Sequence, residues 1–127
     1  MRRKYFSMIT EEEKISCQRV TEVFAEFFEQ HGDMTVAPAG KWGFVHLCYY
    51  DGDSFAVNQV YQDSHELFET LWQCWKEHML LSPVEGTPLV ECSYEELYEM
   101  LKPEERQVFA NKRVELWNRA FGSQPTG

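Results

Sequence analysis

The pattern of hydrophobic and polar positions predicts an N-terminal helix. Apolar residues recur at helical spacing from Val20 to Phe28, and glutamates occupy the opposite face. Thr10 followed three residues later by Glu13 has the form of a capping box, in which each side chain binds a backbone N–H at the helix start. We therefore expect a single helix that begins after Thr10 and stops at Gly32.

Three short segments after this helix are rich in aromatic and β-branched residues, which is typical of strands. They are residues 34–37, 42–50 and 54–61. The dipeptide Asp51-Gly52 suits a two-residue hairpin turn, which would pair Tyr50 with Asp53 and set the register of the last two strands. The segments therefore predict a three-stranded antiparallel meander.

This register assigns the side chains of the sheet to two faces. The expected core face carries Trp42, Phe44, His46, Cys48, Phe55, Val57, Gln59 and Tyr61. The opposite face carries Val45, Leu47, Tyr49, Ala56 and Val60, which are too apolar to face water as a group. We expect the N-terminal helix or the last helix to cover that second face.

The second half of the chain predicts three helices. A long central helix should run from Leu67 to Leu81, after a cap signal at Asp63 and before Ser82-Pro83. The next segment reads as a loop that passes through an edge strand at 89–92. Ser93 then opens a short helix to Leu101, and Pro103 opens a last helix that Gly122 ends.

Together these elements predict an α+β fold. Residues 1–122 form one domain, with an N-terminal helix, a three-stranded antiparallel meander, a long central helix and two C-terminal helices packed on the sheet. Residues 123–127 are expected to form a frayed tail. A length of 127 residues is enough for one core of this kind.

Composition narrows the class of protein. The chain has 12 basic and 21 acidic residues, a net charge of −9, which disfavours direct binding to nucleic acid. No apolar run is long enough to span a membrane, and the four cysteines form no Cys-x-x-Cys pair. We expect a cytoplasmic protein with buried thiols and no secretory signal.

The negative charge is concentrated between residues 43 and 101, where Lys76 is the one basic residue. The candidate partner-binding residues are Asp51, Asp53, Glu91, Glu95, Glu96, Glu99, Glu104 and Glu105. Because complementary charge steers association, such a surface suits a basic protein partner, including one that handles nucleic acids. The leading hypothesis is a non-catalytic protein-binding domain of adaptor, immunity or inhibitor type.

Two alternatives compete with this hypothesis. His46, Gln59 and His78 are polar residues on predicted core faces, so they could line a pocket for a small ligand or form an enzymatic site. No predicted carboxylate shares those faces to tune a histidine, which favours a non-catalytic protein with no cofactor. The second alternative is a structural homo-oligomer joined through the apolar back face of the sheet, so that both a monomer and a homodimer stay open.

Two smaller features complete the candidates. His46 and Cys48 share a strand face, while Cys74 and His78 share a helix face, so the four could converge on a zinc ion. Both pairs lie in regular elements among aromatic residues, so we interpret them as core residues and predict no metal. Arg113 falls in the apolar arc of the last helix, where it should extend along aromatic surface to water or pair with an acidic neighbour.

Overall fold

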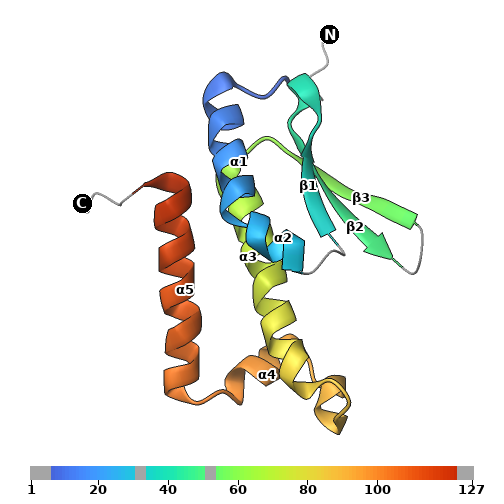
Figure 1. Cartoon of the computed structure of the whole chain (residues 1–127), viewed down its shortest axis with the longest axis vertical. Coiled ribbons are helices and arrows are strands. Elements are labelled where there is room, and N and C mark those ends of the chain that lie inside the picture. Colours follow the sequence, from blue (N-terminus) through green and yellow to red (C-terminus); the bar gives the residue numbers. More distant parts are fainter. Residues whose placement is uncertain (1–6, 31–33, 51–53, 123–127) are drawn as a thin grey trace.

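A computed structural model of the chain describes residues 7–30, 34–50 and 54–122, and it confirms the α+β prediction (Figure 1). Three antiparallel strands in the order β1-β2-β3 follow the first helices and precede the others. The elements are α1 (Glu11–Val23), α2 (Ala25–Gln30), β1 (Met34–Pro38), η1 (Gly40–Trp42), β2 (Phe44–Tyr50), β3 (Ser54–Tyr61), α3 (Ser64–Leu81), η2 (Ser82–Val84), η3 (Pro88–Glu91), α4 (Tyr94–Glu99) and α5 (Pro103–Phe121), where η marks a short 3₁₀ helix. Asp51, Asp53 and the expected tail at 123–127 lie outside the described residues.

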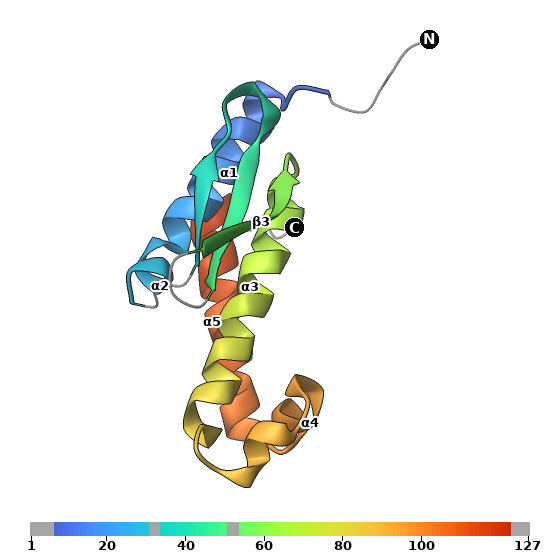
Figure 2. The same cartoon turned by 90° about the vertical axis from the view of Figure 1, so that its right-hand side faces the viewer.

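The long helices lie on one side of the sheet (Figures 1 and 2). α1 packs against α3 and α5, and α3 also contacts β3. The prediction that the N-terminal or the last helix covers the back face of the sheet is therefore wrong. Val45 and Leu47 are only partly buried there, and Val60 is 45% exposed. The physical reason is that α1 and α5 bury their apolar faces against each other and α3, which leaves neither helix for the second face.

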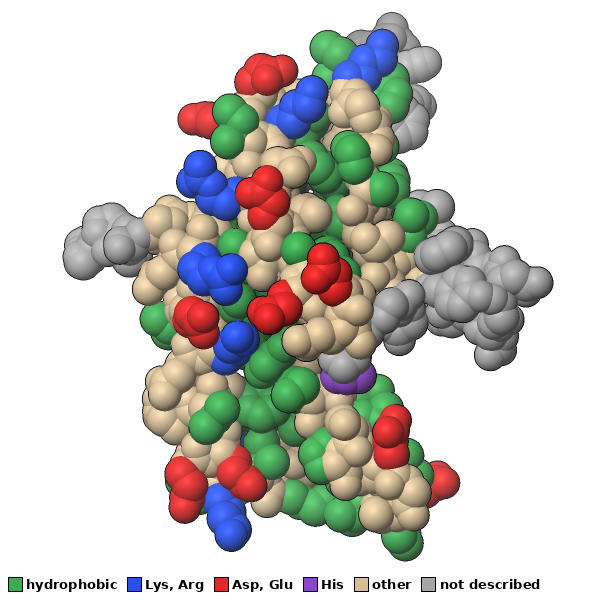
Figure 3. All heavy atoms as spheres, viewed as in Figure 1, with side chains coloured by type: hydrophobic (Ala, Val, Ile, Leu, Met, Phe, Trp, Pro, Cys, Tyr) green, Lys and Arg blue, Asp and Glu red, His purple; other side chains and the backbone are tan. Residues whose placement is uncertain are grey.

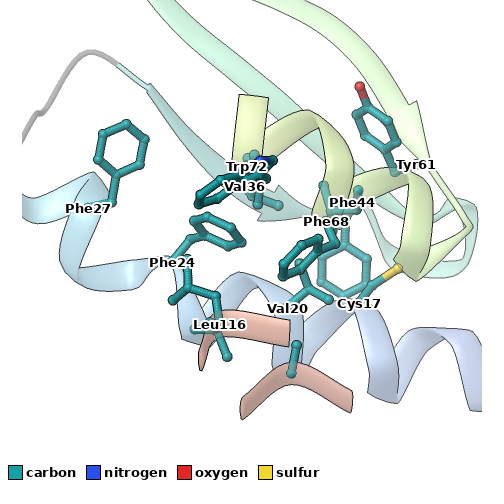
Figure 4. Close-up of a cluster of buried hydrophobic side chains, with 14 of the residues drawn as sticks. Cys17, Val20, Phe24, Phe27, Val36, Phe44, Tyr61, Phe68, Trp72 and Leu116 are labelled. Carbon is teal, nitrogen blue, oxygen red and sulfur yellow. The ribbon is translucent and has the colours of Figure 1, made fainter. Parts of the chain in front are cut away.

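The core fills the space between the helices and the sheet (Figure 4). Its largest fully buried side chains come from α1, α3 and the turn that follows α1. The rings of Phe24 and Phe68 meet edge to face with centroids 5.5 Å apart. Burying one such side chain stabilises the fold by about 1.5 to 3 kcal/mol, so this cluster supplies a large part of the free energy of folding.

Cys17 lies in the same core and has no exposed surface. Burial, with the nearby carboxylates of Glu13 and Asp63, raises the pKa of its thiol to about 12. The thiolate is the reactive form of cysteine, so this side chain is an inert packing group.

The first helix is interrupted at Phe24, where a single helix was expected. Phe24 leaves the helical conformation, with φ −96° and ψ 6°, and its N–H donates to the carbonyl oxygens of Val20 and Glu22. The chain resumes as α2 at Ala25. This turn buries both Phe24 and Phe27 in the core. The predicted stop at Gly32 lies outside the described residues.

The predicted hairpin register is also wrong. Tyr50 lies opposite Ser54, not Asp53, and an irregularity between His46 and Leu47 shifts the pairing by one further residue. A two-residue turn at Asp51-Gly52 cannot produce this pairing, because three residues separate Tyr50 from Ser54. A bulge of this kind arises from the whole sheet and leaves no simple sequence signal.

Two of the residues expected on the core face are exposed, because one precedes β2 and the other lies on the edge strand β3. Phe44, His46 and Tyr61 are buried as predicted. Trp42 lies in η1 and is 43% exposed, and Gln59 is exposed. β2 begins after Gly43, whose φ of +123° suits glycine, and a Cβ there would lie 2.3 Å from the carbonyl oxygen of Tyr61.

Two further predictions concern the second half of the chain. The expected edge strand at 89–92 is instead the 3₁₀ helix η3. Pro88 favours a helical start, and the side chain of Thr87 accepts a hydrogen bond from the N–H of Leu89. Arg113 donates from both terminal nitrogens to Glu69, at 3.0 and 2.6 Å, so the salt bridge that joins α5 to α3 is the second of the two roles expected for it.

The starts of α1 and α3 are joined by one side chain. Thr10 accepts from the N–H of Glu13, which is one half of the predicted capping box. The Glu13 carboxylate, expected to bind at the start of α1, instead accepts from the N–H of Ser64 at 2.7 Å and stabilises the first turn of α3. Ser64 is buried, so loss of this acceptor would leave a backbone donor without its partner.

This contact gives a first prediction. Replacing Glu13 by Ala should lower the free energy of unfolding by about 1 to 2 kcal/mol, because a charged acceptor is removed from a part-buried N–H. Glu12→Ala is the matched control, since Glu12 is an exposed acid in the same first turn. Urea unfolding followed by circular dichroism measures both variants. Equal losses of stability would show that the contact to Ser64 contributes nothing beyond the helix dipole.

Candidate functional site

The last part of α3 extends past the sheet and, with α4 and the start of α5, forms a separate end of the molecule (Figures 1 and 2). We call residues 77–109 the helical end. Local caps build its turns: Ser93 accepts from the N–H of Glu96, and the Glu96 carboxylate accepts from the N–H of Ser93 at 2.8 Å. This is the capping box that the sequence predicts for α4.

Arg106 holds α4 against the start of α5. Its Nη2 donates to the carbonyl oxygens of Glu99 and Leu101, at 3.1 and 3.0 Å, and its guanidinium lies 5.9 Å from the ring centroid of Tyr98. The Nε atom is buried without a hydrogen-bond partner among the described residues. The charged guanidinium of Arg106 therefore stabilises the turn between α4 and α5.

Aromatic contacts attach this end to the rest of the molecule. The ring of Phe109 meets the rings of Trp75 and Tyr98 edge to face, with centroids 5.5 and 5.8 Å apart. Lys76 Nζ lies 5.2 Å from the ring centroid of Tyr98. Such pairs contribute about 0.5 to 1.5 kcal/mol beyond burial, so α3, α4 and α5 form one packed unit.

An apolar groove of about 340 Å³ opens on the helical end. It is lined by Met79, Leu80, Pro83, Val84, Leu89, Leu97, Met100, Leu101, Glu105, Val108 and Phe109. Met100 is 52% exposed and Val108 is 61% exposed, which is unusual for neighbouring apolar side chains. Figure 3 shows hydrophobic side chains gathered over this lower part of the molecule, with acidic side chains on both sides.

The candidate acidic residues of the helical end are all exposed, but they do not share one role. The six residues are Glu91, Glu95, Glu96, Glu99, Glu104 and Glu105. The Glu96 carboxylate caps α4, and the Glu105 carboxylate accepts from the N–H of Lys102 at 2.8 Å to cap α5. Glu95 and Glu99 line a second, more polar groove of about 350 Å³ between α3 and α4.

The helical end carries more negative charge than the candidate residues alone. Glu77 and Glu85 also belong to it, so the segment between positions 77 and 106 contains eight acidic residues and only two basic ones, Lys102 and Arg106. With Arg106 bonded to backbone carbonyls, most of the negative charge is not neutralised by a neighbouring cation. This end therefore has a strong negative potential over a distance of about one Debye length, roughly 8 Å.

Comparisons with protein family models, curated proteins and solved structures give no match for this chain. We therefore infer a function from the chemistry of the described residues alone. Across those residues, no helix combines the length and the apolar character needed to cross a membrane.

The three residues of the alternative pocket differ in how far they are buried. His46 is 2% exposed, whereas its cross-strand neighbour Gln59 is exposed on the edge strand. His78 is partly buried and meets the ring of Phe27 edge to face, with centroids 5.9 Å apart. Burial lowers the pKa of His46 below its ordinary value of 6.5, because desolvation disfavours the charged ring.

The alternative metal site needs four side chains to converge. His46 Nε2 lies 3.9 Å from Cys48 Sγ, as expected for neighbours on one strand face. Within the described ranges, however, no group of three or more His, Cys, Asp or Glu side chains is placed to hold a metal ion. Cys74 and His78 therefore do not complete such a group with them.

The apolar groove is the part of the site that sequence reasoning missed. Its walls come from the end of α3, from η2, η3 and α4, and from the start of α5. A weak signal exists in α5, where Val108 falls outside the apolar arc that contains Phe109 and Leu116. Leu89 and Val90 gave a misleading signal, because an adjacent apolar pair suggests a strand.

The lowered pKa of His46 predicts how stability depends on pH. The folded state binds fewer protons than the unfolded state, so stability is fullest above about pH 6.5 and falls as the pH drops through that value. Urea unfolding between about pH 7.5 and pH 5.5 should show a smaller loss of stability for His46→Gln than for the wild type, with a difference of at most about 1.4 kcal/mol for each pH unit below 6.5. Parallel curves for the wild type and His46→Gln would contradict a role for His46.

Proposed function

We propose that this protein is a non-catalytic protein-binding domain, of adaptor, immunity or inhibitor type, that binds a basic protein through its helical end. The observation that carries the proposal is the combination of exposed acidic side chains and an open apolar groove on the same end of the molecule. Charge alone would suit a solubility role, and an apolar groove alone would suit many ligands. Together they match the polar rim and apolar centre of a protein interface.

The charge supports a basic partner for a physical reason. Like charges repel, and most of the net charge of −9 comes from residues of the helical end. A partner with a basic surface would be attracted before contact, and its association would be faster than that of a neutral protein. Proteins that handle nucleic acids present such surfaces, because they neutralise phosphates with Lys and Arg.

The arrangement of polar groups supports a binding role over a catalytic one. The groove has one ionisable lining residue, Glu105, and its carboxylate already accepts a backbone hydrogen bond from Lys102. General acid–base or nucleophilic catalysis needs at least two groups within reach of the reacting atoms. The groove therefore resembles a contact surface more than an active site.

The test begins with the partner, captured from the native host and identified by mass spectrometry. Reversing Glu91, Glu95 and Glu99 to Lys should slow its association about tenfold or more, because these acids contribute steering and do not cap a helix. The three substitutions are at exposed positions, where each usually costs under about 0.5 kcal/mol of stability. Surface plasmon resonance over a range of salt concentrations measures the association rate.

The matched control reverses three exposed acids of α1 and α2, Glu12, Glu22 and Glu26, with the same change in net charge. This control should leave the rate within about threefold of the wild type, since its charges lie outside the helical end. The wild-type rate should also fall as the salt concentration rises. A partner whose association ignores both salt and the reversal at the helical end would show that the charge serves only solubility.

A further inference from the structure

The lining of the apolar groove argues against a small-molecule ligand. Such ligands are usually enclosed over most of their surface and are oriented by several convergent polar groups. Here Met100 and Val108 are more than half exposed, and Glu105 is the one polar side chain in the lining. An open, apolar groove of this kind covers one side of its occupant and leaves the other side in water.

The elements around the groove indicate which peptide conformation would fit. An added strand requires a free strand edge, and the groove lies between helical segments. A proline-rich helix requires a groove lined by several aromatic rings, and Phe109 is the one aromatic residue here. The remaining common mode is an amphipathic α-helix that lays its apolar face into the groove.

The walls of the groove include two helical segments. Leu97 lies in α4, Met100 and Leu101 follow the end of that helix, and Val108 and Phe109 lie in α5. Helix side chains form ridges, and a third helix packs its own ridge into the groove between two helices. The flexible side chains of Met79 and Met100 adapt to the shape of an apolar partner, as methionine does on other binding surfaces.

The charge around the groove defines the polar face of the occupant. Glu85, Glu91 and Glu104 are exposed on the segments that form its walls, and Glu105 lies in the lining. Acidic residues beside an apolar groove favour Lys or Arg beside the apolar face of a bound helix. An acidic helix in the same place would meet repulsion from all four carboxylates.

We infer that the apolar groove binds an amphipathic helix of a protein partner, with apolar residues at i, i+3 or i+4 and i+7 and with Lys or Arg beside them. This inference rests on the proposed function, because it names the part of the basic partner that makes contact. In this arrangement the groove provides the apolar contacts, and the surrounding glutamates select for basic residues.

The test is a peptide selection, which does not require the partner to be identified first. A display library of random peptides of about 16 residues, enough for roughly four helical turns, is selected against the immobilised full chain. Enriched peptides should carry apolar residues at spacings of three and four, with an excess of Lys and Arg. The strongest peptide is then synthesised, and its affinity is measured by fluorescence anisotropy.

Two exposed valines of α5 provide the decisive comparison. Val108 lines the groove and is 61% exposed, whereas Val114 is outside it and is 58% exposed. Val108→Asp should weaken binding about tenfold or more, although the added negative charge favours a basic peptide. Val114→Asp should leave the affinity within about twofold. Met100→Asp gives a second groove variant at another exposed position.

The other outcomes separate this inference from the proposed function. Basic peptides without helical spacing, bound equally by the wild type and Val108→Asp, would overturn the inference and support the proposed function. Enrichment of neutral or acidic peptides would overturn both. A failure to enrich any peptide would overturn the inference that the groove binds a helix. A dimer of the wild type in sedimentation equilibrium that Val108→Asp dissociates would overturn it too, because a second copy would then occupy the groove.

Discussion

The structure depends on the packing of α3, because this helix touches both halves of the molecule. Its buried residues Leu67, Phe68 and Leu71 have no exposed surface and lie in the first half of the helix, where α1, α5 and the sheet surround it. With 18 residues at 1.5 Å each, α3 is about 27 Å long, and its second half extends past the strands (Figure 1). The second half must then be covered by other segments, and the short helices after Leu81 provide that cover.

This constraint explains why the helical end differs from the core. Three short elements, η2, η3 and α4, surround the end of α3. They bury Leu97 and Leu80, but they leave Met100 and Leu89 partly exposed. A sheet or a long helix in the same place would have closed the surface. The apolar groove is thus a consequence of covering a long helix with short segments.

Local signals in the sequence were enough to predict the starts of α1, α3 and α4. The caps at Thr10, Asp63 and Ser93 are confirmed, because a cap depends on a few neighbouring residues. The strand register was wrong, because the bulge near His46 depends on the whole sheet. The expected core face of the sheet is the one that the helices cover, but the expectation that a helix also covers the back face was wrong, because α1 and α5 pack against each other and α3.

The candidate site was predictable only in part. The acidic positions follow from composition, and all those within the described ranges are exposed. The apolar groove required the structure entirely, because its walls come from segments whose arrangement depends on the Arg106 contacts between α4 and α5.

The two surfaces of the helical end would contribute to binding in different ways. Exposed charges act before contact and change mainly the association rate and its dependence on salt. Apolar contacts form after docking and change mainly the dissociation rate. Glu91, Glu95 and Glu99 belong to the first class, while Met100 and Val108 belong to the second. A partner that is fast to associate but slow to dissociate therefore needs both a basic surface and an apolar face, which an amphipathic basic helix combines in one element.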